Sequence, residues 1–477
     1  MRTRCLILYL LALSAGLTAA IAGEDRGQAA ALKLRFVQEW RSGTRDASGE
    51  FMAGTETMRL LGYKGKLYAS LGDWMDVPYG KAKGDNPWTG AQVLVKESAE
   101  GPWRIAVCFG ESYLRTEALA ALAFTTDAKG VTLANPVTML AAGPSDVNLE
   151  AGAHATVWTR DDATGKWTKT EVAREPRQAG VRSFGSHVDK VTHVHHVFAG
   201  VSRGEIYRGV YDPAAAGKLR WEHEPELSGT GRVMCFTECN GDLYAAAGLK
   251  EGGDTGGLYR RVDGSQPKWG LVYRWPYTPV VKGDEANIMR GLTAVSDAHG
   301  SAGISPATAH QVLLGTRAHP GVVERIDPAK DHAVSVELDI KARFAKEWGL
   351  AELRGPALSA YNRMVPFGVP GSGELVHFIG VWVNHPDHRT PPHNGAYYLV
   401  RRQDGHYDCG TVYDREHPMA AGRGLVATRT IEVSPFPEDR GRVLYFGGYD
   451  CASQESHNTA WIYKGLLEGS ARGQGER

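Results

Sequence analysis

Two segments near the C-terminal end of this 477-residue chain repeat the same order of residue types. In residues 375–402, and again in residues 443–464, an apolar stretch reaches glycine, a polar loop follows, and an aromatic stretch opens after His-Asn. His393 and His457 take corresponding places in the two copies. A segment that recurs along a chain indicates stacked units, and units of short antiparallel strands are typical of a β-propeller.

Residues 231–275 give the clearest view of one unit. Strands are predicted at residues 232–239, 242–248, 257–262 and 269–275. The Asn240-Gly241 pair has the composition of a two-residue hairpin turn, which needs positive φ at both central residues. The second strand also recurs, because residues 65–72 align without a gap with residues 241–248. We therefore predict four antiparallel strands in each blade.

The last unit shows only three clear strands, and a segment near the N-terminus can supply the fourth. Residues 32–40 alternate between apolar and polar types and have no partner of their own. A ring of blades has no open sheet edge when strands from the two ends of the chain pair with each other. We predict an all-β fold, a seven-bladed propeller in which residues 31–41 complete the last blade. Six or eight blades stay open, because the unit in residues 117–175 is the least regular. A short helix is predicted at residues 340–348.

The first 22 residues have the three parts of a secretion signal. Arg2 and Arg4 precede an apolar run at residues 5–13, and a small-x-small pattern ends at Ala22. The run is shorter than the roughly 20 apolar residues that span a bilayer, so no stable membrane anchor is expected. We predict a signal peptide at residues 1–22, one propeller domain at 23–467, a disordered polar tail at 468–477, and a secreted or periplasmic protein.

Charge and cysteine content narrow the class of partner. The chain has 54 basic and 54 acidic residues and a formal net charge of 0. Because there is no basic surplus, nucleic acid is not expected as a partner. The cysteines are too sparse for a disulfide scaffold, and strand geometry places Cys235 and Cys239 too far apart to pair. We expect a monomer in which Cys235 is buried and unreactive.

Four segments resemble a family of uncharacterised secreted bacterial propellers. They are residues 290–295, 321–328, 427–437 and 443–450. The resemblance covers mainly the C-terminal half of the chain. It implies a propeller fold and export, with no activity to carry over. The Ser-x-Asp-x-Gly-x-Thr-Trp box of sialidases does not occur in the sequence, and no motif specific to propeller-shaped ulvan lyases is found.

Polar and aromatic residues gather in the loops between second and third strands, which open on one face of a propeller. Aromatic, acidic, basic and imidazole side chains together are the composition expected of a carbohydrate site, although surface loops are commonly polar. The ligand-binding candidates on this loop-rich face are Asp73, Trp74, Arg317, His319, Trp382, His385, His388, His393, Asp450, Glu455 and His457.

The most specific prediction among these candidates concerns His393 and His457, because the repeat places them at matching corners of adjacent blades. Two imidazoles so placed could bind a metal ion or act as base and acid. Alternatively, the repeated His-Asn closes each loop through bonds to the local backbone. No spacing such as His-Glu-x-x-His supports a metal by itself, so a metal is not assigned.

A second cluster of candidates consists of His193, His195 and Tyr207. Alternation along a strand would put His193 and His195 on the same side. With Asp189 nearby in the sequence, these residues resemble half of a metal site, and the alternative is that they are ordinary histidines at a strand start. Tyr207 could donate a proton, but tyrosines in sheets more often serve packing.

Three functions fit these observations. The first is a secreted propeller that binds a glycan or another cell-surface ligand on its loop-rich face. The second is a polysaccharide lyase or glycoside hydrolase on the same face. The third is a periplasmic interaction scaffold. The fold alone does not distinguish among these functions. The sequence therefore assigns no catalytic residue and no cofactor, and whether the protein is an enzyme stays open.

Overall fold

Antiparallel pairing accounts for nearly all of the regular structure. The computed structural model describes residues 32–73, 89–146, 154–173, 180–248, 256–275, 289–296, 310–317, 321–354, 357–359, 363–450 and 458–468. The chain separates into Met1–Leu32 and Lys33–Arg477, and every strand reported below lies in the second part.

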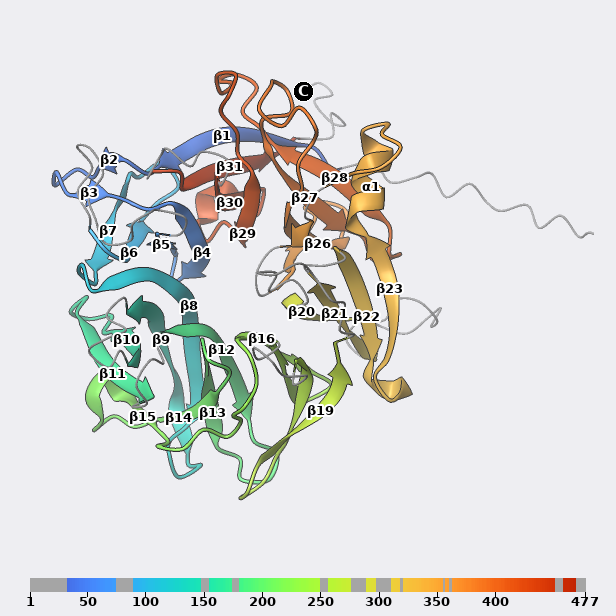
Figure 1. Cartoon of the computed structure of the whole chain (residues 1–477). Helices are drawn as coiled ribbons and strands as arrows, with labels where there is room; N and C mark the ends of the chain where they lie inside the picture. The colour runs from blue at the N-terminus through green and yellow to red at the C-terminus, as the bar shows by residue number, and fades with distance from the viewer. Residues whose placement is uncertain are drawn as a thin grey trace, which may run out of the picture. The chain divides into compact units, whose positions relative to one another are not determined.

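Three sheets hold four strands each, and in each sheet the strands pair in chain order. The first contains β12 (Val181–Val188), β13 (His195–Val201), β14 (Ile206–Tyr211) and β15 (Leu219–Trp221). The second contains β16 (Val233–Cys239), β17 (Asp242–Ala247), β18 (Gly257–Val262) and β19 (Lys268–Arg274). The third contains β20 (Met289–Ser296), β21 (Gln311–Arg317), β22 (Val322–Asp327) and β23 (Ala333–Asp339). Figure 1 shows them in succession from green to orange.

The fourth sheet joins two further units through a single pair of residues, Gly72 and Arg115. Its first unit contains β4 (Glu56–Tyr63), β5 (Lys66–Gly72), β6 (Gln92–Lys96) and β7 (Trp103–Cys108). Its second unit contains β8 (Tyr113–Thr126), β9 (Thr132–Asp146), β10 (Ala155–Arg160) and β11 (Trp167–Ala173).

The fifth sheet is likewise double, and Trp382 and Ala427 form its link. One unit contains β24 (Leu358–Ser359), β25 (Val365–Gly368), β26 (Leu375–Trp382), β27 (Ala396–Arg401) and β28 (Tyr407–Val412). In it, β24 and β25 pair with successive parts of β26 and together take the place of one strand. The other unit contains β29 (Ala427–Val433), β30 (Val443–Tyr449), β31 (Trp461–Leu467) and β1 (Leu34–Arg41). Dividing both double sheets at their links groups the described strands into seven units.

Smaller elements connect these sheets. A two-stranded ladder, β2 (Thr44–Arg45) with β3 (Phe51–Met52), lies between β1 and β4 in the sequence. The helix α1 (Ile340–Glu347) confirms the short helix predicted at residues 340–348. Asp339 caps it, because its side chain accepts a hydrogen bond from the Ala342 backbone N–H at 2.9 Å. The 3₁₀ turns of the described residues are Ala216–Lys218, Pro328–Lys330 and Pro437–Asp439.

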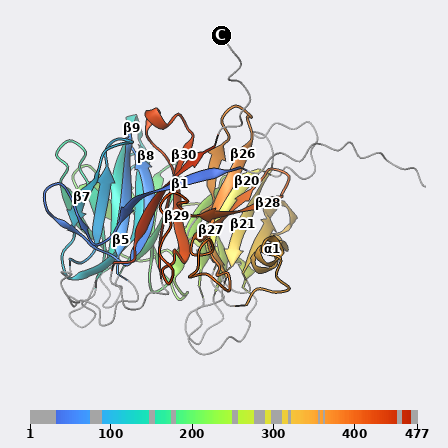
Figure 2. The same cartoon turned by 90° about the horizontal axis from the view of Figure 1, so that it is seen from above.

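The N-terminal strand completes the last unit. β1 pairs antiparallel with β31, from Leu34 opposite Leu467 to Arg41 opposite Trp461. In Figure 2, the blue strand β1 lies in the same part of the molecule as β29 and β30, which belong to its sheet. The prediction that residues 31–41 close the last blade is therefore confirmed, and the edge of β31 is covered.

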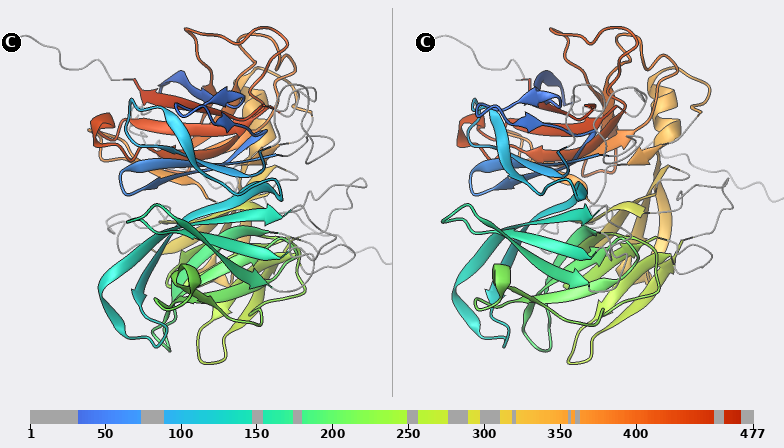
Figure 3. Two further views of the ribbon diagram at one scale, coloured as in Figure 1. Left: turned by 90° about the vertical axis from the view of Figure 1, so that its left-hand side faces the viewer. Right: turned by 60° about the vertical axis from the view of Figure 1, so that its left-hand side comes forward.

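The first strands of the units form the inside of the assembly. β4, β8, β12, β16 and β20 each contact the next strand of that series. β24 contacts β20, β25 contacts β29, and β29 contacts β4, which returns the series to its start. Figure 3 shows the red sheet of the last unit next to the blue sheet of the first. The predicted fold class, an all-β propeller, is confirmed.

Glycines in second strands let neighbouring units approach closely. A Cβ built on Gly200 in β13 would lie 2.7 Å from the Val233 Cβ in β16. A Cβ on Gly447 in β30 would lie 2.6 Å from the Thr57 Cγ2 in β4. Both contacts join the second strand of one unit to the first strand of the next, and neither leaves room for a larger residue.

Local predictions of turns and burial also hold. Asn240 and Gly241 have φ values of 51° and 76°, as the predicted hairpin turn requires. Cys235 is 1% exposed and has a free thiol. The predicted signal peptide and residues 469–477 of the predicted tail lie outside the described residues. Within the described ranges, no helix combines the length and hydropathy of a membrane span.

Candidate functional site

Four predicted loop-face residues lie at the same end of their units. Asp73 directly follows β5, Arg317 and Trp382 end β21 and β26, and Asp450 directly follows β30. In each unit the end of the second strand pairs with the start of the first strand, as Arg317 does with Met289. The four residues therefore lie at the end of the ring where the inner strands begin, which we call the entry end. Trp74, His319, Glu455 and His457 lie outside the described residues.

Trp382 and Tyr449 form an aromatic pair at the entry end, where the last two units meet. Their ring centroids are 6.4 Å apart and their planes are 65° apart. Trp382 is half-buried, and among the described residues its indole N–H has no hydrogen-bond partner. Asp450, the residue after Tyr449, is 3% exposed. An aromatic pair, an indole N–H without a partner among the described residues, and a buried carboxylate thus lie at the entry end of the last two units.

Arg429 and Glu56 extend this group toward the inner strands. Arg429 Nη1 forms an ion pair with Glu56 Oε2 across the contact between β29 and β4. Burial lowers the pKa of Arg429 to about 10, and Tyr449 acts in the opposite direction. Both partners are almost completely buried. Because the protein interior screens charges less than water does, this ion pair would interact strongly with a ligand nearby.

His393 contacts a histidine of its own loop. Its ring stacks on that of His385 with centroids 3.6 Å apart and planes within 3°. Both residues belong to the loop between β26 and β27, whereas His457 lies outside the described residues, so the proposed pair of His393 and His457 stays a prediction. His388 belongs to the same loop, and its Nδ1 lies 3.2 Å from the His385 carbonyl oxygen.

The contacts around this histidine stack mainly hold the loop in place. His385 Nδ1 accepts a hydrogen bond from the Asp387 backbone N–H at 3.0 Å, and its ring packs edge-on against Trp348. The Tyr397 hydroxyl donates to the His393 carbonyl oxygen at 3.1 Å. Burial, with help from His393, lowers the pKa of His385 and favours its neutral form. In the described ranges, no three His, Cys, Asp or Glu residues are grouped as a metal site would require.

The second predicted cluster does not share one face of a strand. His193 lies in the turn before β13 and has φ 59°, so the alternation expected from it to His195 is wrong. The His195 Nδ1 accepts from the Thr125 backbone N–H at 3.1 Å, and its Nε2 lies 2.7 Å from the Ser186 hydroxyl. The Tyr207 hydroxyl donates to Glu205 Oε2 at 2.9 Å. These contacts use the polar atoms of His195 and Tyr207 within the protein.

Asp189 belongs to a buried charge network and does not resemble a vacant metal ligand. Its Oδ1 accepts from the backbone N–H groups of Val191 and Thr192 at 2.9 and 2.8 Å. Its Oδ2 accepts from Arg261 Nη1 at 2.9 Å and from the Gly264 backbone N–H at 3.1 Å. Burial alone would raise the pKa of Asp189, but these bonds hold it well below its usual range.

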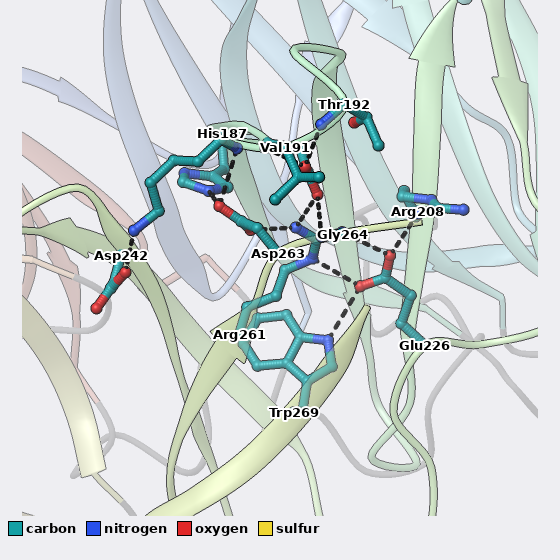
Figure 4. Close-up of polar contacts among 12 residues, drawn as sticks. His187, Val191, Thr192, Arg208, Glu226, Asp242, Arg261, Asp263, Gly264 and Trp269 are labelled. Carbon is teal, nitrogen blue, oxygen red and sulfur yellow. Dashed lines mark hydrogen bonds and ion pairs between the residues drawn. The ribbon is translucent and has the colours of Figure 1, made fainter. Parts of the chain in front are cut away.

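Arg261 connects two neighbouring units through this network. Figure 4 shows its guanidinium between Asp263 and Glu226. Arg261 Nε donates to Glu226 Oε2 at 2.9 Å, and the Trp269 indole N–H donates to the same oxygen at 3.1 Å. Arg261 lies in β18, whereas Asp189 and Glu226 flank strands of the preceding unit. Its side chain is 0% exposed, so the network serves to hold the units together.

A series of arginines at the entry end was not predicted from the sequence. They lie in first strands or, for one, directly before a first strand: Arg59, Arg115, Arg182, Arg232, Arg290 and Arg429. The recurrence of arginine at the start of successive first strands was the signal that could have revealed them. In several of these strands the pairing register skips a residue, which is a β-bulge, and the skipped residues include Arg182, Arg290 and Arg429. Bulges are frequent beside functional sites because they re-aim side chains.

Comparison with known proteins adds the following. No family model and no curated protein matches the chain. Among solved structures, an α-L-arabinanase from Penicillium chrysogenum in complex with arabinobiose is 10% identical, with a TM-score of 0.43 over 90% of this chain and 97% of its own. The NanB sialidase from Streptococcus pneumoniae is 10% identical, with a TM-score of 0.41 over 91% of this chain and 70% of its own. Sqt1 from Chaetomium thermophilum is 11% identical, with a TM-score of 0.40 over 83% of this chain and 80% of its own. Likeness at this level says nothing about ligand or reaction.

Proposed function

We propose that the protein is a secreted propeller that binds a carbohydrate at its entry end. The observation that carries this proposal is the group formed by Trp382, Tyr449 and Asp450. The half-buried indole of Trp382 offers apolar surface to the C–H face of a sugar ring at little entropic cost, and Tyr449, which is 3% exposed, packs against it. A buried carboxylate beside them accepts strong hydrogen bonds from hydroxyl groups.

The free indole donor supports a polar ligand over a purely apolar one. A buried N–H without a partner costs roughly 1–3 kcal/mol, and a ligand oxygen that accepts from it would remove that cost. The ion pair of Arg429 and Glu56 adds a donor and an acceptor from the adjoining inner strands. Sugar hydroxyls both donate and accept, so they match this mixture of groups.

Hydrolysis or elimination on a bound glycan is the second candidate. Glu56, Asp73 and Asp450 are buried carboxylates at the entry end of two adjacent units. Glycosidases commonly use two carboxyl groups, one as acid and one as base or nucleophile. Binding needs fewer assumptions about the positions of these groups, and we retain it as the main proposal.

A glycan array probed with the purified full chain, followed by assays for reducing ends and unsaturated uronic acids, tests both candidates. Binding should be weakened in Trp382→Ala by on the order of tenfold or more, as expected for loss of an aromatic contact with its hydrogen bond. The matched control is Trp158→Ala. Trp158 is also half-buried, and its ring centroid lies 5.2 Å from that of Phe109. Unlike Trp382, it lies in β10, the third strand of the second unit.

The outcomes separate the alternatives. Binding without new reducing ends or unsaturated products supports a binding protein, and turnover lost in Asp450→Asn supports an enzyme. If no glycan binds, or if Trp382→Ala and Trp158→Ala bind equally well, the proposal fails. A periplasmic scaffold would then be the remaining function.

A further inference from the structure

We infer that a second subsite lies at Arg317, in the unit of β20–β23, and that the ligand is an oligosaccharide that engages two adjacent units. This inference rests on the proposed function for the sugar and deepens it by specifying a chain of sugars. Arg317 ends β21 and pairs with Met289, the first residue of β20. Trp382 ends β26 and pairs with Leu358, the first residue of β24. Arg317 and Trp382 thus take the same place in neighbouring units.

Arg317 and Glu324 form a buried ion pair on one face of their unit. Arg317 Nε lies 3.0 Å from Glu324 Oε1, and the two side chains are 7% and 4% exposed. Glu324 is opposite Gly315, two residues before Arg317, so the alternation of strands puts both side chains on the same face. The Tyr273 hydroxyl, from β19 of the preceding unit, lies 3.5 Å from Glu324 Oε1. The ion pair therefore lies where two units meet.

Polar atoms of this ion pair have no hydrogen-bond partner in the described part of the chain. They are Arg317 Nε, Arg317 Nη1 and Glu324 Oε2. The close approach of Arg317 Nε to Glu324 Oε1 lacks the direction that a hydrogen bond requires. Buried donors and acceptors are rarely left unsatisfied, because each one costs free energy. A donor and an acceptor are thus available here to a third group.

Buried arginines that hold units together have different surroundings. Arg261 Nε, Nη1 and Nη2 all donate to carboxylates. Arg401 Nε and Nη2 donate to Glu337, and its Nη1 donates to the Arg402 carbonyl oxygen. Every side-chain nitrogen of these two arginines therefore has a partner within the protein. Arg317 is almost as deeply buried, and holding units together does not account for its unbonded nitrogens.

A sugar hydroxyl matches the atoms that Arg317 and Glu324 leave available. A hydroxyl oxygen accepts from Arg317 Nη1, and a hydroxyl proton donates to Glu324 Oε2. Neighbouring hydroxyls on one sugar ring can engage both atoms at once. Burial raises the pKa of Glu324, and Arg317 and Tyr273 offset this only in part. A hydroxyl that donates to Glu324 would stabilise its ionised form further.

The two subsites together call for more than one sugar residue. Trp382 supplies an aromatic contact and Arg317 a polar contact, both at the entry end. Their units are direct neighbours, because β24 contacts both β20 and β21. Once one sugar is bound at the first subsite, the next part of the same chain binds the second at a high effective concentration. Affinity should therefore rise with the length of the oligosaccharide.

Calorimetric titration of the full chain with gluco-, manno- and xylo-oligosaccharides of one to six residues tests the inference. In the series that binds, we expect the hexasaccharide to bind at least about tenfold more tightly than the monosaccharide, as added hydrogen bonds to charged groups would produce. This gain should be lost in Arg317→Gln, and also in Arg317→Gln with Glu324→Gln, which removes the ion pair as a unit. The control is Arg220→Gln in β15, whose side chain is 49% exposed, and it should keep the gain.

Each outcome decides a different part. Affinity that does not change with chain length overturns the inference and leaves carbohydrate binding standing. A gain that persists in both Arg317 variants with native melting curves also overturns it. If none of the three series binds, the inference fails, and the glycan array decides whether carbohydrate binding stands. A crystal structure with the hexasaccharide checks the contact itself: a sugar hydroxyl on Arg317 Nη1 supports the inference, and a water molecule in its place overturns it.

Discussion

Gly447 in β30 packs directly against the side chain of Thr57 in β4, so no third residue separates the last unit from the first at this point. A Cβ on Gly447 would lie 2.6 Å from Thr57 Cγ2. The Thr57 hydroxyl also donates to the Trp461 carbonyl oxygen at 3.0 Å. Because residues from opposite ends of the chain meet here, this contact and the pairing of β1 with β31 close the ring.

Gly447→Ala should destabilise the protein by about 1–3 kcal/mol, because the added methyl group forces the two strands apart. The free energy of unfolding from chemical denaturation measures the effect. The control is Gly368→Ala, since no atom lies within 4 Å of a Cβ built at Gly368. Equal stability of the two variants would show that the first and last units do not meet as described.

Deletion of residues 31–41 should cause aggregation, because it exposes the edge of β31. It also removes Phe36, whose ring lies 5.1 Å from that of Phe446. Size-exclusion chromatography of the truncated protein checks this. Deletion of residues 469–477 serves as the control and should leave the protein unchanged. A monomeric truncated protein with an unaltered melting curve would contradict ring closure through β1.

Cys235 should resist labelling by a thiol reagent in the native protein. It is buried, and burial raises its pKa to about 12, with Arg59 opposing the shift. Since the thiolate is the reactive form, both factors suppress reaction. Cys108 is exposed and should react first. Mass spectrometry of labelled peptides distinguishes the two, and rapid modification of Cys235 would disprove its position in the core.

His187 should make part of the stability depend on pH. Burial lowers its pKa, but Glu238 at 3.3 Å and Asp263 at 3.0 Å raise it above the usual value. A histidine whose pKa is higher in the folded than in the unfolded state stabilises the fold fully below the unfolded pKa. It loses that contribution as the pH rises through the folded pKa.

The stability difference between the natural protein and His187→Gln should therefore be largest near pH 5.5 and shrink toward pH 9. Denaturation curves at several pH values measure it. Glu238→Gln removes one of the two carboxylates and should reduce the pH dependence. A difference that is constant from pH 5.5 to pH 9 would mean that His187 stays neutral in the folded protein.

The sequence revealed the fold where local signals agree with the global arrangement. The Asn240-Gly241 turn and the small residues of second strands mark the hairpins, because a ring of close-packed sheets needs both. β9 was harder to delimit, since Pro136 and Pro144 would ordinarily interrupt a strand. Both prolines lie outside the part of β9 that pairs with β10, Leu140–Ala142, so they do not remove bonds of that pairing.

The candidate site could be predicted only in part. Strand order indicated that Asp73, Trp382 and Asp450 lie at one end of the ring, where the structure also has them, and their role in binding stays a prediction. The series of arginines was not predicted because its members are far apart in the sequence, and only the ring brings Arg182 and Arg115 onto one carboxylate, that of Glu117. The stacking of His385 on His393 depends on the path of a single loop, which residue spacing does not specify.

Hydrogen exchange with and without a bound glycan tests the central claim most directly. For a glycan identified on the array, the account predicts added protection at the entry end, in peptides that cover Trp382, Arg429 and the start of β4. The hairpin turns at Lys64-Gly65 and Asn240-Gly241 join first to second strands at the other end, and they should exchange as before. Protection confined to those turns or to the outer strands would contradict ligand binding at the entry end.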